Sequence, residues 1–278
     1  MKLHTINTGL FKLDGGAMFG VVPKTIWSKT NPTDENNLCT LAMRCLLIEE
    51  GERLILIDTG IGDKQDPKFL SYYYLHGDDS LDKSLATLGF TADDITDVLL
   101  THLHLDHVGG AVKRDGDNLV PTFKNAIYWT NQEHWVWAID PNEREKASFL
   151  KENLLPLKQS GQLQFIDIMN AKLTENISIH FVSGHTKAMM LPQINYKGKT
   201  ILYIADLLPT VGHIPLPYIP SYDMFPLTTL NEKKFFLNVA AEKEFILFLE
   251  HDAENECCTV HQTEKGIRLK QVFKLTDI

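Results

Sequence analysis

Short runs of hydrophobic residues alternate with polar turns along most of the chain, a pattern typical of a protein with many strands. Residues 3–12 alternate loosely, and the apolar runs 41–49 and 53–57 are joined by the turn Glu50-Gly51-Glu52. Further short apolar runs lie at 97–100, 126–129, 163–168, 177–182, 200–204 and 245–249. We predict a strand at each of these places.

Helical spacing is clearest where Leu81, Leu85 and Leu88 follow Ser80, a favourable N-cap, and precede Gly89, a favourable stop. Helices are also predicted over 131–138, 143–155 and 231–242, the second of them exposed.

The charged segment 140–160 separates two β-rich halves, each followed by helices, and it lacks the Gly/Ser-rich composition of a flexible linker. We therefore predict one domain, residues 1–278, made of two pseudo-symmetric halves with a seam near 140–160.

Composition narrows the classes of function. With 278 residues and 44% hydrophobic content, the chain can bury a large core. The net charge of -9 argues against a nucleic-acid partner. No apolar stretch is long enough to span a membrane, and the first residues lack the apolar region of a secretory signal. The four cysteines form no C-x-x-C pair, so reduced thiols in a cytoplasmic protein are expected.

The strongest chemical signal follows the predicted strand 97–100. His102, His104, Asp106 and His107 fall within six residues, directly before Gly109-Gly110. A polar loop with scattered histidines is the plain alternative, but three of the 11 histidines in so short a stretch is improbable by chance. Imidazole and carboxylate donors converging at a strand end are what zinc prefers. We interpret this segment as half of a metal site.

Three later side chains complete the pattern. His185, Asp206 and His251 each lie just after an apolar strand, as expected of ligands gathered at one sheet edge. Asp58, at the end of strand 53–57, is either a turn-former or, as we favour, a carboxylate that orients a ligand histidine.

The order His-x-His-x-Asp-His, Gly-His-Thr, Asp after an apolar strand, then His-Asp resembles the metallo-β-lactamase superfamily along nearly the whole chain. The resemblance implies an α+β fold, a four-layer αβ/βα sandwich of two mixed β-sheets flanked by helices. It also implies two divalent ions, most simply zinc, with manganese, cobalt or iron as alternatives. By resemblance the first ion would be held by His102, His104 and His185, and the second by Asp106, His107 and His251. Asp206 would bridge both, although Ala205 stands where the family usually has Gly or Ser.

Within the superfamily, residues 14–23 and 215–226 are similar to the branch of quorum-quenching lactonases and methyl parathion hydrolases. By that likeness a hydrophobic substrate pocket would be lined by Met18, Phe19, Trp27, Tyr218, Tyr222 and Phe225. Residues 14–23 have two equal interpretations from sequence: a glycine-rich hairpin whose Met18 and Phe19 fill the core, or a loop that walls the site. His213, in a proline-rich loop, could contact substrate.

The implied chemistry is hydrolysis by a hydroxide shared between two metal ions, with Asp106 also delivering a proton to the leaving group. The favoured substrate is a small N-acyl homoserine lactone. Pro209 departs from the best-known lactonases, which have Tyr three residues after the bridging Asp, so a phosphotriester or aryl ester hydrolase is the alternative. A mononuclear thiolester hydrolase or dioxygenase of the same fold also stays open. Relatives are often dimers, which leaves a homodimer open too.

Other classes fit less well. No Gly-x-Ser-x-Gly nucleophile elbow is present, so covalent acyl catalysis has no support. The diiron flavoprotein branch usually has Glu where this chain has His104, and the tRNA-processing branch has a basic surface that a charge of -9 does not provide.

Overall fold

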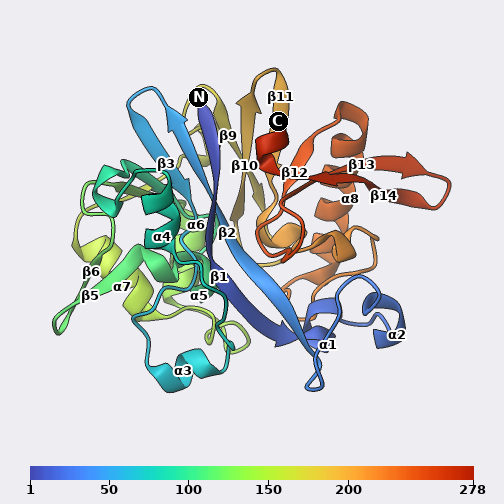
Figure 1. Cartoon of the computed structure of the whole chain (residues 1–278), viewed down its shortest axis with the longest axis horizontal. Coiled ribbons are helices and arrows are strands. Elements are labelled where there is room, and N and C mark those ends of the chain that lie inside the picture. The colour runs from blue at the N-terminus through green and yellow to red at the C-terminus, as the bar shows by residue number, and fades with distance from the viewer. The chain divides into compact units, whose positions relative to one another are not determined.

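The computed structural model describes residues 1–278, and its strands form two six-stranded sheets and a two-stranded one (Figure 1). The first sheet has the order β1-β2-β3-β4-β7-β8. Its strands are β1 (Lys2–Asp14), β2 (Leu38–Glu50), β3 (Arg53–Ile57), β4 (Asp97–Leu99), β7 (Ile127–Thr130) and β8 (Leu163–Phe165). β2 and β3 are antiparallel, whereas β3, β4, β7 and β8 run parallel. Continuous apolar sequences suit such strands, because both faces of a parallel sheet are usually covered.

The second sheet has the order β14-β13-β12-β11-β10-β9. Its strands are β9 (Ile177–Val182), β10 (Met189–Tyr196), β11 (Lys199–Tyr203), β12 (Ile246–Phe248), β13 (Cys257–Thr263) and β14 (Gly266–Phe273). Only β11 and β12 are parallel neighbours, and the other pairs are antiparallel. β9, β11 and β12 therefore point the same way, and their carboxyl ends share one edge. The small sheet pairs β5 (Val112–Asp115) with β6 (Asn118–Pro121).

Eight α-helices and six short 3-10 helices complete the chain. The α-helices are α1 (Gly15–Phe19), α2 (Lys24–Trp27), α3 (Pro67–Ser71), α4 (Leu81–Thr87), α5 (Leu105–Val108), α6 (Gln132–Ile139), α7 (Lys151–Gln159) and α8 (Pro226–Lys243). The 3-10 helices are η1 (Ala92–Asp94), η2 (Gly109–Ala111), η3 (Ile168–Asn170), η4 (Ala205–Leu207), η5 (Val211–His213) and η6 (Leu275–Asp277). Ser80 caps α4 as predicted, because its side chain accepts a hydrogen bond from the Lys83 amide. Two mixed six-stranded sheets with flanking helices confirm the predicted fold class.

Contacts divide the chain into two compact units. The first contains Met1–Leu10 and Met43–Ala171, and the second contains Phe11–Ala42 and Lys172–Ile278. α7, which lies largely within the segment proposed as a seam, belongs to the first unit. In the second unit α8 packs on β13 and β14 (Figure 1). The single domain over 1–278 stays a prediction.

Two sequence predictions of local structure were wrong. Residues 14–23 form no hairpin: Asp14 caps the short helix α1 by accepting from the Ala17 amide, and no strand follows. The exposed helix predicted over 143–155 is also displaced, since turns occupy 143–148 and α7 begins only at Lys151. α7 buries Leu154 and Leu157, and Pro156 lies inside the helix between them.

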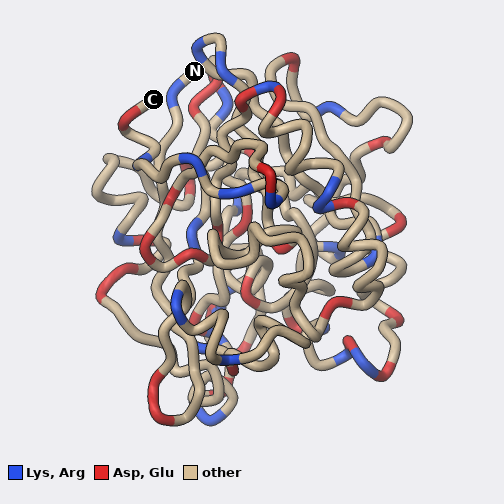
Figure 2. Tube along the Cα trace, turned by 90° about the vertical axis from the view of Figure 1, so that its right-hand side faces the viewer, with Lys and Arg blue, Asp and Glu red and all other residues tan.

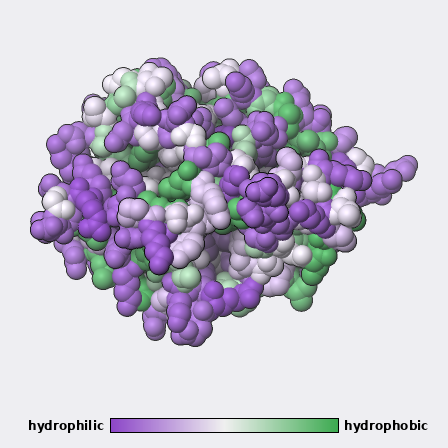
Figure 3. Space-filling model, turned by 60° about the horizontal axis from the view of Figure 1, so that its bottom comes forward, coloured by the Kyte–Doolittle hydropathy of each residue, from purple (hydrophilic) through white to green (hydrophobic).

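Charged and hydrophobic residues are dispersed over the surface. In Figure 2 basic and acidic positions are interspersed along the trace. Figure 3 shows hydrophobic residues reaching the surface in separate small areas among polar ones. Of the chain's large hydrophobic residues, the most exposed are Val21, Met169 and Leu227. No helix is both long and apolar enough to cross a bilayer.

Candidate metal centre

In the first unit, the predicted ligands follow β4 at the edge where β3 also ends. Parallel pairing places Ile57 opposite Leu99, so Asp58 and Thr101 leave their strands side by side. The chain then enters α5, whose first turn carries Asp106 and His107. A Cβ on Gly110 would lie 2.2 Å from the Thr59 carbonyl oxygen, so only glycine permits this close packing of the turn.

Hydrogen bonds fix which nitrogen of His102 and of His104 carries the proton. The Thr101 hydroxyl donates to Asp58 (2.6 Å), so its oxygen is left to accept from His102 Nδ1 (3.1 Å). His104 Nε2 donates to the Glu145 carboxylate (2.9 Å). His102 Nε2 and His104 Nδ1 therefore face each other with lone pairs, 3.1 Å apart. Two nitrogens bound to one tetrahedral zinc lie about 3.3 Å apart, so this pair fits a metal ion.

Asp58 contacts His107, one of the predicted ligands. One carboxylate oxygen accepts from the Thr101 amide (2.8 Å), and the other accepts from His107 Nδ1 (3.2 Å). This leaves His107 Nε2 unprotonated and 3.7 Å from the Asp106 carboxylate. Asp58 and His107 are fully buried. The carboxylate–histidine pair is the usual arrangement by which a protein orients a metal-binding imidazole.

Replacing Asp58 with Asn should weaken metal binding and lower kcat/KM by about 10- to 100-fold. The amide group would turn a donor toward His107 Nδ1, which also donates, so the ring would lose its orientation. Competition with a fluorescent chelator would measure the zinc affinity. Unchanged affinity and activity in a variant with unaltered Tm would contradict this role.

In the second unit, the three remaining predicted ligands converge at the shared edge of β9, β11 and β12. His185 Nδ1 donates to Asp223 (2.9 Å), and His251 Nδ1 donates to the Ala42 carbonyl (2.8 Å). Both Nε2 atoms therefore carry lone pairs. Each faces a different oxygen of Asp206, at 3.2 Å for His185 and 2.9 Å for His251. With neutral imidazoles these contacts join acceptor to acceptor, and a cation between them would stabilise the arrangement, so this donor set also fits metal ions.

Ala205, directly before Asp206, has a φ of 43°. This left-handed conformation strains any residue with a Cβ, whereas glycine adopts it freely. Strain next to the Asp206 carboxylate is typical of a functional site.

The aromatic residues predicted to bind substrate gather in the second unit. The Phe19 ring stacks on the ring of Trp27, with 4.9 Å between centroids and 7° between planes, and on the ring of His213, with 4.3 Å and 11°. Tyr218 and Phe19 meet edge to face, with 6.4 Å between their ring centroids. Met18, Phe19, Trp27 and His213 are buried, Tyr218 and Tyr222 are half-buried, and Phe225 is exposed. Substrate contact by these residues stays a prediction.

His213 is a neutral structural residue. Its Nε2 must donate to the Met18 carbonyl (2.9 Å), so Nδ1 accepts from the Thr210 hydroxyl (2.9 Å). Burial lowers the pKa of His213 to about 3. It therefore does not serve as an acid or base near neutral pH.

This pKa predicts a pH-dependent stability. Below pH 6.5 the unfolded chain takes up a proton at His213 that the folded chain refuses down to about pH 3, so stability is lost as the pH falls through that window. Between pH 7.5 and 5.5, zinc-free protein should lose about 1 kcal/mol more unfolding free energy than a His213→Phe variant. Urea unfolding at both pH values tests this, and equal losses would refute it.

Several residues that shape the donors gave no sequence signal. Asp223 lies 38 residues beyond His185, and Glu145 lies 41 beyond His104 in a charged, surface-like stretch. His134 is buried and accepts a hydrogen bond from the amide of Leu103, which lies between two predicted ligands (2.8 Å).

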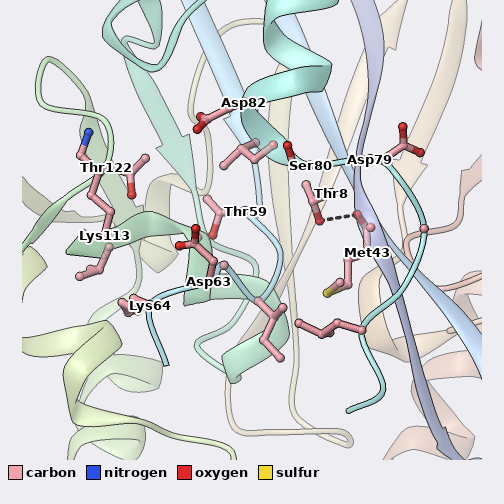
Figure 4. Close-up of a pocket in the computed structure, with 18 of the residues that line it drawn as sticks. Thr8, Met43, Thr59, Asp63, Lys64, Asp79, Ser80, Asp82, Lys113 and Thr122 are labelled. Carbon is pink, nitrogen blue, oxygen red and sulfur yellow. Dashed lines mark hydrogen bonds between the residues drawn. The ribbon is translucent and has the colours of Figure 1, made fainter. Parts of the chain in front are cut away.

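A cavity of about 690 Å³ in the first unit is separate from these ligands (Figure 4). Its wall includes Thr8, whose hydroxyl donates to the Met43 carbonyl (2.8 Å). It also includes Gly110 and the buried Lys64, which donates to the Gly109 carbonyl. None of the predicted metal ligands lines this cavity.

A family model for the metallo-β-lactamase superfamily matches residues 44–251. The chain belongs to this superfamily. The His and Asp donors described above are consistent with a binuclear metal site. The protein is a metal-dependent hydrolase of the metallo-β-lactamase superfamily.

Solved structures of metallo-β-lactamase-fold proteins match nearly the whole chain. A probable metal-dependent hydrolase from Staphylococcus aureus is 28% identical, with 98% of each chain covered and a TM-score of 0.87. AidC, a dizinc quorum-quenching lactonase in complex with a product, is 23% identical over 98% of this chain and 95% of its own, with a TM-score of 0.80. A mutant of AiiA from B. thuringiensis with N-decanoyl-L-homoserine bound is 20% identical over 91% of this chain and 94% of its own, with a TM-score of 0.70. A search of curated proteins gives no match.

Proposed function

We propose that the donors of the two units together hold two divalent metal ions, most simply zinc, and that the enzyme opens the lactone ring of N-acyl homoserine lactones. His102, His104 and His185 would hold one ion, and Asp106, His107 and His251 the other. The observation that carries the proposal is the carboxylate of Asp206, whose two oxygens face two different ligand histidines. That is the arrangement a carboxylate needs to bridge two ions.

Two bound ions would supply a hydroxide at neutral pH and polarise the substrate carbonyl. The chain's own residues keep the donors ready for them. Asp58, Glu145 and Asp223 each accept a hydrogen bond from a predicted ligand imidazole, which directs the other nitrogen's lone pair to the metal.

Asp106 is placed to handle the proton of the leaving group. Its side chain is 18% exposed, whereas the side chains of His104, His107, His185, Asp206 and His251 are 0–11% exposed. A carboxylate that reaches outward can take up the proton released by the attacking water and then give it to the alkoxide that forms when a lactone opens.

The substrate class rests on the aromatic residues and on the relatives. Tyr218 and Tyr222 offer partly exposed rings for an acyl chain, with the Trp27–Phe19–His213 stack behind them. AidC and the AiiA mutant were solved with an N-acyl homoserine product. Pro209, in place of the usual tyrosine, favours an aryl ester or phosphotriester hydrolase as the second candidate.

The test is a comparison of kcat/KM on three substrates: N-hexanoyl-L-homoserine lactone, p-nitrophenyl acetate and a dialkyl p-nitrophenyl phosphate. We expect the lactone to be preferred by at least about 100-fold. Preference for the aryl ester or the phosphotriester would overturn the lactonase proposal and select the second candidate.

A further inference from the structure

Within the second unit, one buried turn of α8 carries three polar side chains that face the loops of the metal half-site. Thr229, Glu232 and Lys233 are spaced i, i+3 and i+4, so they project from the same face of the helix. Each of them binds a different part of these loops.

Thr229 and Glu232 act around His185. The Thr229 hydroxyl donates to Asp223 (2.7 Å), whose other oxygen accepts from His185. Glu232 accepts from the amides of Ser183 (2.7 Å) and Gly184 (2.9 Å). A Cβ on Gly184 would lie 2.3 Å from the Thr229 backbone nitrogen, so the chain lies directly on α8 here. These two side chains therefore determine where His185 points.

Lys233 acts on a different segment. Its ammonium group donates to the carbonyl oxygens of His213 (2.9 Å), Pro215 (3.2 Å) and Tyr218 (2.6 Å). The side chain is 1% exposed, and these three bonds use all three N–H groups of the ammonium. A buried charge needs such compensation, because burial favours its neutral form. Accordingly burial lowers the pKa of Lys233 to about 7, and Asp223 opposes this effect.

Residues 213–218 are thus held from two sides. Lys233 binds their backbone, while Phe19 stacks on the His213 ring and contacts Tyr218 at its edge. Residues 213–218 contain no strand or α-helix, so contacts such as these, together with the hydrogen bonds of His213 to Met18 and Thr210, determine their path. The same segment supplies Tyr218 and leads to Tyr222, whose hydroxyl donates to the sulfur of Met18 (3.2 Å).

We propose that Lys233 is a positioning residue that shapes the acyl-binding wall at Tyr218 and Tyr222, and so sets selectivity for acyl-chain length. This rests on the proposed function, because that function makes these tyrosines the wall. Thr229 and Glu232 orient His185, whereas Lys233 orients the wall. Side chains of the same turn of α8 thus act on two different parts of the site.

The test compares Lys233→Met with Lys234→Met, which removes the same charge from an exposed neighbour on α8. For Lys233→Met we expect KM for N-decanoyl-homoserine lactone to rise at least about tenfold. For N-butyryl-homoserine lactone kcat should stay within about threefold. Zinc content should not change, and Lys234→Met should behave as the parent.

Hydrogen exchange gives a readout that does not depend on activity. In Lys233→Met the amides of 211–222 should exchange at least about tenfold faster, while those around His185 keep their protection. If Lys233→Met fails to fold, Lys233→Gln, which keeps two donor hydrogens, serves in its place. Equal losses on both lactones together with loss of zinc, or unchanged exchange over 211–222, would overturn the proposal.

A parent protein that opens no lactone would end the proposed function and with it the role in acyl selectivity. The exchange experiment separates that outcome from failure of the positioning role. Faster exchange over 211–222 would support Lys233 as the residue that holds the segment, and unchanged exchange would refute it.

Discussion

Replacing Asp206 with Asn is expected to lower kcat/KM by at least about 1,000-fold, because losing a bridged metal pair removes several kcal/mol of transition-state stabilisation. The two oxygens of Asp206 face His185 Nε2 at 3.2 Å and His251 Nε2 at 2.9 Å. An amide keeps one oxygen but turns an NH2 group toward the other histidine. The amide nitrogen and the histidine that it faces would then bind no cation. Zinc measured by mass spectrometry should fall from about two ions per chain to one or fewer.

Asp82→Asn is the matched control, since Asp82 is an exposed carboxylate in the first turn of α4. It should keep the parent's zinc content, Tm and kcat/KM. A zinc content of two with parental activity in Asp206→Asn would show that this carboxylate bridges nothing.

Replacing Asp106 with Asn should lower kcat for lactone opening by about 10²- to 10⁴-fold, the usual contribution of a general acid. An alkoxide is a poor leaving group and needs a proton, whereas p-nitrophenolate leaves without one. The loss on a p-nitrophenyl ester should therefore be at least about tenfold smaller than the loss on the lactone. Measuring both substrates on one preparation separates proton delivery from metal binding.

The outcome is decided by the ratio of the two losses. Equal losses accompanied by zinc depletion would mean that Asp106 only binds metal. Asp58→Asn provides a comparison, because Asp58 contacts His107 but is fully buried and cannot reach a leaving group. Its effect should be the same on both substrates.

Candidate donors could be named from the sequence because their signal is local. His102 to His107 lie in one short segment, and His185, Asp206 and His251 each follow an apolar strand. A strand end is recognisable from its neighbours alone. Asp223 and Glu145 are different, because only the fold brings them to their histidines from 38 and 41 residues away. No pattern of neighbouring residues marks such partners.

Two of the strands that the sequence analysis missed, β10 and β14, were hidden for physical reasons. β10 pairs on both sides, yet it contains Pro192, which normally argues against a central strand. β14 lies at the sheet edge and buries none of its residues, so its sequence has no continuous apolar run: Arg268, Lys270 and Gln271 interrupt it. The helix α1 was hidden by the glycines at its start, Gly15 and Gly16, which suggested a turn.

The most direct test of the central claim is the metal content of the purified protein together with opening of N-hexanoyl-L-homoserine lactone, before and after chelation and after zinc is restored. We predict about two ions per chain, loss of turnover on chelation, and recovery only as the second ion binds. One ion per chain, or turnover that survives complete chelation, would contradict a binuclear metal-dependent lactonase.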